Sequence, residues 1–280
     1  MSERRIFRDA ALQSEFDRNG FVIVDFLAPE SIERLRALGE QVPSDLDSIA
    51  YASSIMSADL DYRARAFDLV RSEFAAHVAS LLSDYRLCYG TFITKSAGDA
   101  DGRGFLGLHQ DPTFVDESRH VSIGIWCPLV DVGEGNGCLT VVPGSHRFNR
   151  LPRCVMIPFP YSDLLPTIRA NHLVPVPMKA GRAFVYSSAL FHGSGANRSG
   201  ALRLVAGGLA IPNETELLFV TNGEGDHAED LAMYRVDDDY YQRYRFGLPP
   251  SGATFVGFLP YRFEPLDEQS LQRRLPAVRA

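Results

Sequence analysis

A histidine and an aspartate separated by one residue, His109 and Asp111, are the side chains in this sequence that most clearly suggest metal chemistry. If the segment is extended, alternate side chains point to the same face, so both could reach one metal ion. Far downstream, His192 supplies a third candidate ligand and Arg203 a cation. Two histidines and one carboxylate on one face of an iron leave three positions open, as in the facial triad of non-haem Fe(II) oxygenases. For the His-x-Asp pair alone, an exposed turn is the alternative interpretation.

The segments that must carry these residues have the alternating pattern of short strands. Such patterns recur through the middle of the chain, at residues 87–94, 121–129, 138–142, 172–176, 182–186 and 202–210. A glycine-rich loop over residues 98–107 leads to His109, and a tight glycine turn over residues 133–137 joins two of the strands. His192 lies between the last two of these segments.

The N-terminal part has helical spacing instead. Helices are predicted over residues 9–19, 29–41 and 63–85, a strand over 21–26, and an irregular loop over 43–60. Short strands, regular turns and flanking helices indicate a mainly β fold, a jelly-roll barrel with helices packed outside one sheet. We expect a single domain over residues 1–280, with N-terminal helices over about 9–83, a barrel core over about 85–212 and a C-terminal lid or extension over about 213–280.

Three segments are candidate lids over a binding site: residues 43–60, 146–170 and 213–262. They carry many aromatic residues, namely Tyr51, Phe159, Tyr161, Phe219, Tyr234, Tyr240 and Tyr241. Within the last of them, a short helix over residues 237–245 and a strand over 255–261 are predicted. Aromatic lids favour a moderately apolar substrate, because ligand pockets are mostly apolar with a few orienting polar groups.

Composition, charge and cysteine spacing make several classes of protein poor candidates. A chain of 280 residues with 45% hydrophobic residues can bury a sizeable core. The formal charge of −7 and the lack of a long basic run make nucleic acid a poor partner. No apolar stretch has the length of a membrane span or the form of a signal peptide. The spacing of Cys88, Cys127, Cys138 and Cys154 matches no zinc or redox signature. We expect reduced cysteines and a cytoplasmic protein.

Four segments taken together, in order and at suitable spacing, resemble a known family. They are His109-Gln110-Asp111, residues 126–131 (Trp-Cys-Pro-Leu-Val-Asp), residues 136–146 (from Asn136 to Pro-Gly-Ser-His146), and residues 192–199 with Arg203. The chain resembles the phytanoyl-CoA dioxygenase family of Fe(II)- and 2-oxoglutarate-dependent oxygenases over roughly residues 15–210. The last seventy or so residues show no such resemblance.

The resemblance implies a double-stranded β-helix, a cupin-like form of the jelly roll. It also implies His109, Asp111 and His192 as iron ligands, and Arg203, helped by Ser194, as the anchor of 2-oxoglutarate. A planar guanidinium can bind the distal carboxylate of this dianion through two hydrogen bonds. Trp126 is expected near the co-substrate, although a core role is equally open. The implied reaction uses O2 and couples decarboxylation of 2-oxoglutarate to oxidation of a substrate C–H bond.

Three further residues are candidates for substrate contact. Gln110 and Thr113 flank the predicted metal ligands, and Lys95 ends a strand before the glycine-rich loop. For Lys95 we favour a solvated side chain over a binding role.

Related halogenases have a small residue in place of the carboxylate, so Asp111 favours hydroxylation over halogenation.

The substrate is open at this point. A small organic molecule of specialised metabolism fits the aromatic lids. An acyl thioester on coenzyme A or a carrier protein is the second hypothesis, and Arg147, Arg150 and Arg153 could form its docking patch. A third hypothesis is a cupin-like metal-binding barrel that is not an oxygenase. Arg203 argues against it, because such a barrel has no need of that cation, and the His-x-His pair followed by Glu that is usual in cupins is absent. The oligomeric state is not predicted.

Overall fold

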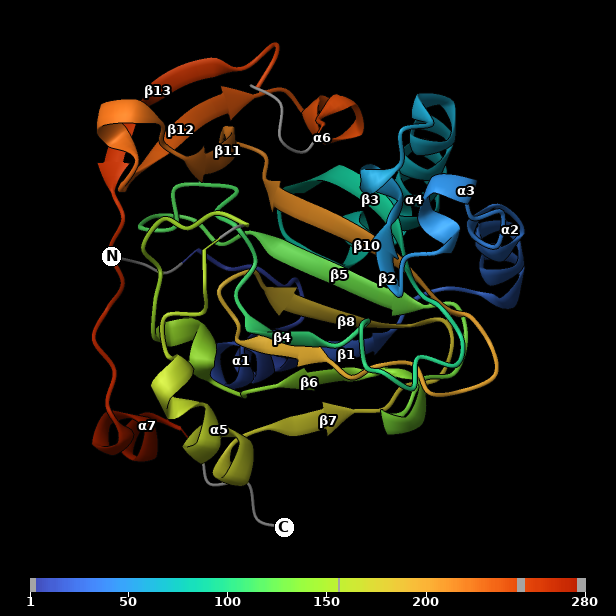
Figure 1. The fold of residues 1–280 in the computed structure, drawn as a ribbon, viewed down its shortest axis with the longest axis horizontal. Coiled ribbons are helices and arrows are strands. Elements are labelled where there is room, and N and C mark those ends of the chain that lie inside the picture. Colours follow the sequence, from blue (N-terminus) through green and yellow to red (C-terminus); the bar gives the residue numbers. More distant parts are fainter. Residues whose placement is uncertain (1–3, 156, 246–249, 276–280) are drawn as a thin grey trace.

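The structure is a computed structural model that describes residues 4–155, 157–245 and 250–275. Two antiparallel sheets form its centre (Figure 1). The major sheet has the strand order β1-β8-β5-β10-β3-β2, and the minor sheet has the order β4-β9-β6-β7. The strands of the major sheet are β1 (Phe21–Asp25), β2 (Tyr51–Ser53), β3 (Tyr85–Lys95), β5 (Ile123–Pro128), β8 (Arg182–Ser187) and β10 (Arg203–Pro212). Those of the minor sheet are β4 (Leu106–His109), β6 (Leu139–Val141), β7 (Val174–Val176) and β9 (His192–Ser194).

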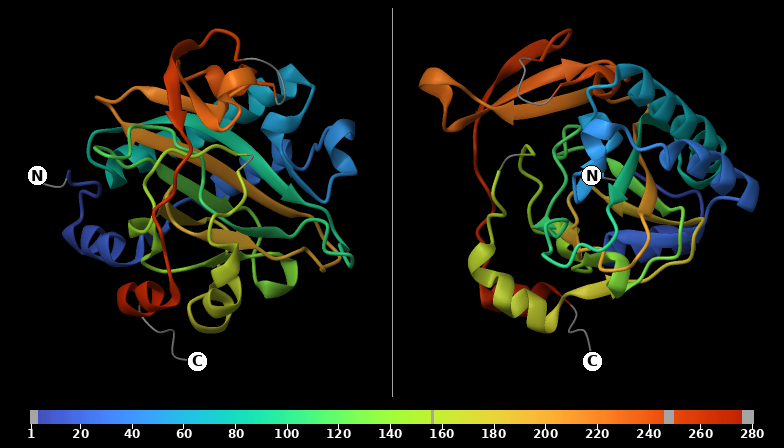
Figure 2. Two further views of the ribbon diagram at one scale, coloured as in Figure 1. Left: turned by 60° about the vertical axis from the view of Figure 1, so that its left-hand side comes forward. Right: turned by 45° about the vertical axis from the view of Figure 1, so that its right-hand side comes forward.

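The two sheets enclose a common interior, which makes the fold a double-stranded β-helix of the jelly-roll type, as predicted (Figure 2). Interior side chains from both sheets pack together. They include Trp126 and Phe184 from the major sheet and Leu139 and Val141 from the minor sheet. Strand β10 is buried along its whole length between β3 and β5. This explains its nearly continuous apolar sequence.

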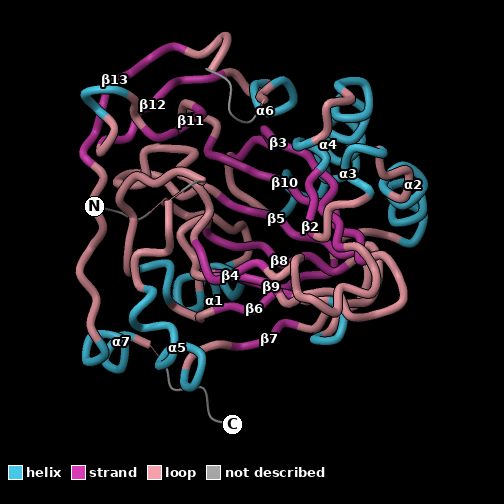
Figure 3. The backbone as a smooth tube through the Cα atoms, viewed as in Figure 1, coloured by secondary structure: helices cyan, strands magenta, loops and turns pink. Residues whose placement is uncertain are grey.

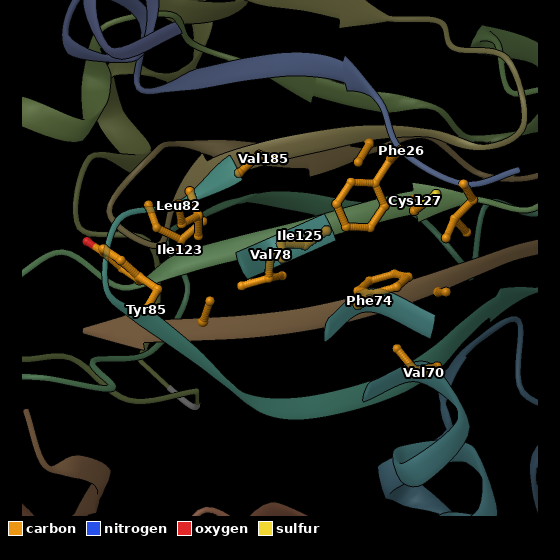
Figure 4. Packing of buried hydrophobic residues seen from close by; sticks show 14 of the residues in the cluster. Phe26, Val70, Phe74, Val78, Leu82, Tyr85, Ile123, Ile125, Cys127 and Val185 are labelled. Carbon is orange, nitrogen blue, oxygen red and sulfur yellow. The ribbon is translucent and has the colours of Figure 1, made fainter. Parts of the chain in front are cut away.

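The opposite face of the major sheet is covered by helices. These are α1 (Ala10–Asn19), α2 (Pro29–Gly39) and α4 (Leu60–Leu81). Asp59 precedes helix α4 as its N-cap, and its side chain accepts a hydrogen bond from the Tyr62 amide, which caps the first turn. Its apolar stripe, which includes Val70, Phe74 and Val78, packs on the outward side chains of β5, including Ile125 (Figure 4). The prediction that the N-terminal helices lie outside one sheet is confirmed.

Short elements border the minor sheet. Helix α5 (Leu165–Asn171) and helix α7 (Glu268–Arg274) lie side by side near β7 (Figure 1). Ile168 of α5 and Leu271 of α7 share a buried cluster with Leu108 of β4. Much of the chain around this sheet is loop (Figure 3).

The described residues also form short 3-10 turns in several parts of the chain. They are η1 (Ser54–Met56), η2 (Glu134–Asn136), η3 (Ser145–Arg147), η4 (Ser162–Leu164) and η5 (Gly225–His227).

The C-terminal region contains more regular structure than the predicted lid or extension, for which only one short helix and one strand were expected. It contains a third antiparallel sheet of β11 (Leu217–Asn222), β12 (Asp230–Val236) and β13 (Thr254–Pro260), followed by the segment that runs to α7 (Figure 1). Helix α6 (Tyr240–Arg243) is shorter than the predicted helix. Phe219, Tyr240 and Tyr241 are buried in the cluster that joins this sheet to the barrel. These aromatic residues therefore form a core. Residues 246–249 and 276–280 of the predicted extension lie outside the described residues.

Other boundaries also differ. The segment 43–60 is not an irregular loop, because it contains helix α3 (Ser44–Asp47), the edge strand β2 and η1. Helix α4 begins and ends about three to four residues before the predicted helix 63–85. The long segment after η3 contains η4 and α5, and its residue 156 lies outside the described residues. All four cysteines are buried and none is joined to another by a disulfide, in agreement with the expectation of reduced cysteines. None of the helices in the described part of the chain combines the length and apolar character that a membrane crossing requires.

Candidate metal and co-substrate site

Three side chains converge where β4 meets β9. His109 is the last residue of β4, Asp111 follows it, and His192 is the first residue of β9. His109 and His192 are cross-strand partners, and their ring centroids lie 4.3 Å apart. The Asp111 Oδ1 lies 3.9 Å from His109 Nε2 and 3.7 Å from His192 Nε2. One candidate ligand atom from each residue lies within 4.8 Å of the other two. The pairing of two strands thus brings together residues that are far apart in sequence.

Backbone carbonyl groups orient both imidazoles. His109 Nδ1 lies 2.9 Å from the Gly107 carbonyl oxygen, and His192 Nδ1 lies 3.0 Å from the Leu190 carbonyl oxygen. Each Nδ1 can therefore donate its proton to a carbonyl, and each Nε2 keeps its lone pair for the shared point. Burial, and then the neighbouring His192, lower the pKa of His109 to about 4. A neutral imidazole is the form that binds a metal ion. The donor set fits a divalent iron, for which two imidazoles and one carboxylate are suitable ligands.

Asp111 is held from several directions. Its amide donates to the Ser188 carbonyl at 2.9 Å, and its own carbonyl accepts from Arg153 Nε at 2.7 Å. The Tyr186 hydroxyl donates to Oδ2 of the carboxylate at 2.8 Å. Burial, and then the charge of Asp111, raise the pKa of Tyr186 well above its ordinary value, so the phenol stays protonated. The second carboxylate oxygen, Oδ1, is the one that faces the two histidines.

Arg203 is a buried cation in the same interior. It begins β10, and its side chain is only 1% exposed. None of its three guanidinium nitrogens has a hydrogen-bond partner among the described residues. Its guanidinium carbon lies 5.6 Å from the centroid of the Trp126 ring. Burial lowers the pKa of Arg203 to about 10. An unpaired buried charge is strongly unfavourable, so this arrangement suits an anionic ligand that is bound from the barrel interior.

Lys95 is fully buried, which corrects the expectation of a solvated side chain. Lys95 of β3 is the cross-strand partner of Tyr51 on β2 and of Arg203 on β10. The three side chains therefore lie on one face of the sheet. The Lys95 Nζ donates to the Ser194 hydroxyl at 2.6 Å and to the carbonyl groups of Ser194 and Gly195. Burial, and then the Arg203 charge, lower the pKa of Lys95 to about 7, against the opposing effect of Asp99. Lys95, Ser194 and Arg203 thus form a second polar cluster beside the triad.

Gln110 and Thr113 are placed differently from the expectation of substrate contact. The Gln110 amide donates to the carbonyl groups of Asn149 and Ala189, at 2.8 and 2.6 Å. Thr113 is buried, and its hydroxyl accepts a hydrogen bond from the Arg153 amide. Both side chains are therefore committed to the protein backbone. Side chains alternate between faces in extended chain. Gln110, between His109 and Asp111, therefore points away from the face that these two residues share.

The arginines of the predicted docking patch are also engaged. Arg153 is buried and forms a two-armed ion pair with Glu117, with N–O distances of 2.9 and 2.8 Å. Arg147 donates to the carbonyl groups of Asp17 and Arg274, and Arg150 donates to that of His120. The expectation that these arginines form one free basic surface is therefore wrong, at least for Arg153.

Two tyrosines of the site were not assigned to it from the sequence. Tyr186 is directly opposite Gly124 in the β5–β8 pair, and a side chain at Gly124 would overlap the Tyr186 ring. This glycine inside a strand was the available signal, since such glycines often mark close approach of another group. Tyr51 was assigned to a lid but lies on β2 beside Lys95. The Lys95 Nζ lies 5.6 Å from the centroid of the Tyr51 ring. Burial raises the pKa of Tyr51, the Arg203 charge opposes this shift and the Asp111 charge adds to it.

The fold and this site together define a double-stranded β-helix protein in which two histidines and one carboxylate lie close enough to bind one metal ion, with a buried arginine beside them. A model of the phytanoyl-CoA dioxygenase family matches residues 16–205. The chain belongs to this family. The match runs from the last turn of α1 through α2, α4 and the barrel to the start of β10, and it contains His109, Asp111, His192 and Arg203.

Individual relatives agree with this assignment. The chain is 33% identical to phytanoyl-CoA dioxygenase 1 of Oryza sativa over 134 residues, which are 45% of this chain and 46% of the relative. It is 25% identical to the dioxygenase trt7 of Aspergillus terreus over 215 residues, or 68% of each chain. The chain spans less than half of the length of the first curated relatives that it matches.

Solved structures with the same fold include the α-ketoglutarate-dependent epimerase SnoN from nogalamycin biosynthesis. It is 22% identical, with a TM-score of 0.53 over 96% of this chain and 98% of that chain. The carbocyclase SnoK from the same biosynthesis is 19% identical, with a TM-score of 0.54 over 75% of this chain and 86% of that chain. At these identities the likeness establishes the fold.

Proposed function

We propose that this protein is an Fe(II)- and 2-oxoglutarate-dependent dioxygenase that oxidises a C–H bond of a small organic substrate. The observation that carries the proposal is Arg203, a buried guanidinium with no partner among the described residues, beside a complete triad of His109, Asp111 and His192. A triad alone would suit many metal-binding barrels. The additional buried cation calls for an anionic ligand that binds next to the metal.

The residues have separate tasks in this proposal. His109, Asp111 and His192 hold the iron. Arg203 binds the distal carboxylate of 2-oxoglutarate, for which its planar fork is suited. Ser194 adds a hydroxyl at this end. When bound, the iron supplies the activation of O2 that couples decarboxylation of the co-substrate to oxidation of the substrate.

Lys95 gives this end of the site a second positive charge. Its Nζ contacts the Ser194 hydroxyl, and its pKa of about 7 is set by burial and by Arg203. A bound dicarboxylate would relieve the repulsion between the two cations and favour the charged form of Lys95. The Trp126 ring lies against the Arg203 guanidinium, with 5.6 Å between the ring centroid and the guanidinium carbon. The protein part of the mechanism is thus to neutralise the co-substrate, orient it and exclude water.

A small molecule of specialised metabolism is the substrate class that the relatives support best. SnoN and SnoK are named as enzymes of nogalamycin biosynthesis, and another neighbour, HygX of Streptomyces hygroscopicus, was solved with nickel, 2-oxoglutarate and hygromycin B. The family name favours an acyl thioester instead. The structure gives this alternative less support, because Arg153 is buried in its ion pair with Glu117 and Arg147 and Arg150 bind backbone carbonyl groups. Four buried cysteines that form no disulfide are compatible with a cytoplasmic location, which stays a proposal.

The test measures consumption of O2 and formation of succinate by the Fe(II)-loaded protein supplied with 2-oxoglutarate. The first assays omit substrate and follow the slow conversion of 2-oxoglutarate to succinate that is not coupled to substrate oxidation. A panel of neutral ring compounds and acyl-CoA thioesters follows. We expect succinate from the wild type, and its loss in His192→Ala and in Arg203→Met.

The matched control is His227→Ala, because His227 is an exposed histidine that also pairs with an aspartate, Asp230, on the surface. It should keep the wild-type rate. A wild-type protein that binds Fe(II) but neither binds nor consumes 2-oxoglutarate would contradict the proposal and favour a cupin-like barrel of another function. Stimulation by acyl-CoA thioesters alone would favour the thioester alternative.

A further inference from the structure

The carboxylate of Asp111 is held asymmetrically. Its Oδ1 faces the Nε2 atoms of both histidines, at 3.9 and 3.7 Å. Its Oδ2 accepts the hydrogen bond from the Tyr186 hydroxyl at 2.8 Å. The two oxygens of one carboxylate are therefore assigned to different partners, one to the metal position and one to a phenol of the opposite sheet.

The Tyr186 ring is fixed on several sides. Tyr186 lies on β8 opposite Gly124 of β5, and a Cβ atom at Gly124 would come within 2.4 Å of the ring carbon Cζ and 2.8 Å of the hydroxyl oxygen. The ring lies at an edge-on angle to His192, with centroids 5.0 Å apart. It also contacts Phe184, at 5.2 Å. The hydroxyl therefore has one well-defined position, and this position is at Asp111.

A carboxylate can bind a metal ion through one oxygen or through both. With both, Asp111 would occupy one of the three positions that a facial triad leaves open. An oxygen engaged in a hydrogen bond with a fixed phenol is withheld from the metal. Partners of ligands act in this way generally, because they set the orientation of the ligand and are needed for full affinity or activity.

We propose that Tyr186 is a positioning residue that keeps Asp111 bound to the metal through Oδ1 alone and so preserves the position that 2-oxoglutarate needs. The inference rests on the proposed function, because it concerns the same metal and co-substrate. Tyr186 does not touch the co-substrate in this role. It acts through Asp111, and it determines whether a coordination position of the metal stays free for 2-oxoglutarate.

The test is Tyr186→Phe, which keeps the ring and removes the hydroxyl. Metal affinity is measured with Mn(II), and 2-oxoglutarate affinity is measured with the Mn(II)-loaded protein, so that no turnover is needed. We expect the dissociation constant of 2-oxoglutarate to rise by about tenfold, or about 1.4 kcal/mol, because the freed Asp111 oxygen competes for its position. Mn(II), which gains that oxygen, should bind as tightly as in the wild type or more tightly. The visible charge-transfer band of the anaerobic Fe(II)–2-oxoglutarate complex should weaken in parallel.

Two further variants separate this role from general stabilisation. Tyr85→Phe is the matched control, because Tyr85 is a buried phenol of the same sheet whose hydroxyl donates to the Val121 carbonyl at 3.0 Å. It should leave both affinities unchanged. Gly124→Ala displaces the Tyr186 ring without removing its hydroxyl. It should weaken 2-oxoglutarate binding as Tyr186→Phe does, and it should add no further loss when the two changes are combined.

Two results would overturn the inference. One is wild-type 2-oxoglutarate affinity and an unchanged band in Tyr186→Phe. The other is a parallel loss of Mn(II) affinity, 2-oxoglutarate affinity and thermal stability, which would indicate a merely structural hydroxyl. A wild-type protein that shows no band at all would instead refute the proposed function.

Discussion

Replacing Arg203 with methionine should have opposite effects on the free protein and on the liganded protein. The arginine is buried, and no hydrogen bond to its guanidinium is found in the described parts of the chain. Burial lowers its pKa to about 10, which corresponds to about 3 kcal/mol against the charged form. The contact with Trp126 offsets about 1–2 kcal/mol of this. Arg203→Met should therefore stabilise the free protein by about 1–2 kcal/mol, or roughly 2–8 °C in melting temperature.

With ligand present the order should reverse. A ligand at one hundred times its dissociation constant stabilises the folded protein by about 2.7 kcal/mol. The wild type loaded with Mn(II) should gain this from 2-oxoglutarate, and Arg203→Met should gain almost nothing. Thermal melts of both proteins, with and without 2-oxoglutarate, measure the effect. The control is Arg182→Met, since Arg182 is an exposed arginine paired with Asp25 on the surface. Equal stabilisation of wild type and Arg203→Met by 2-oxoglutarate would refute the reasoning.

Three further predictions concern Lys95, Glu117 and Gln110. The pKa of Lys95 is about 7. Above this pH the free protein has a neutral Lys95, which must be protonated when the carboxylate binds. The affinity for 2-oxoglutarate should therefore fall by up to about tenfold per pH unit as the pH rises above 7. Calorimetric titration should find this slope reduced in Lys95→Met, and equal slopes would contradict the assignment. Glu117→Gln leaves Arg153 buried without its counter-charge, so urea unfolding should show a loss of about 3–5 kcal/mol; a loss below 1 kcal/mol would count against the buried ion pair. Gln110→Ala frees two backbone carbonyls and should lower stability by about 1–3 kcal/mol without changing KM, whereas a raised KM at full stability would restore a substrate role.

The barrel strands and the nearness of His109 to Asp111 could be predicted from the sequence because both depend on local patterns. The alternation over residues 121–129 predicts β5, and extended geometry places His109 and Asp111 on one face. The cross-strand pairing of His109 with His192 could be inferred only through the resemblance of the flanking motifs. Spacing along the chain does not show which strands are neighbours.

What the sequence could not provide depends on contacts between distant segments. Lys95 looked solvated at the end of a strand, but β2 and β10 flank it and bury it. Arg153 looked like part of a basic patch because its partner Glu117 lies in a different loop. The edge strand β2 has only three residues, and the apolar run of β11 cannot be told from a buried helix by periodicity alone. For this reason only one strand, over residues 255–261, was predicted where the C-terminal sheet has three.

The most direct test of the central claim is anaerobic titration of the metal-free protein with Fe(II) and then 2-oxoglutarate, followed by visible absorption. The account predicts a weak charge-transfer band in the middle of the visible range for the wild type. It predicts no band for His109→Ala, and the wild-type band for His227→Ala. Binding of Fe(II) with no band on addition of 2-oxoglutarate would show that the three ligands hold a metal but that the protein is not a 2-oxoglutarate-dependent oxygenase.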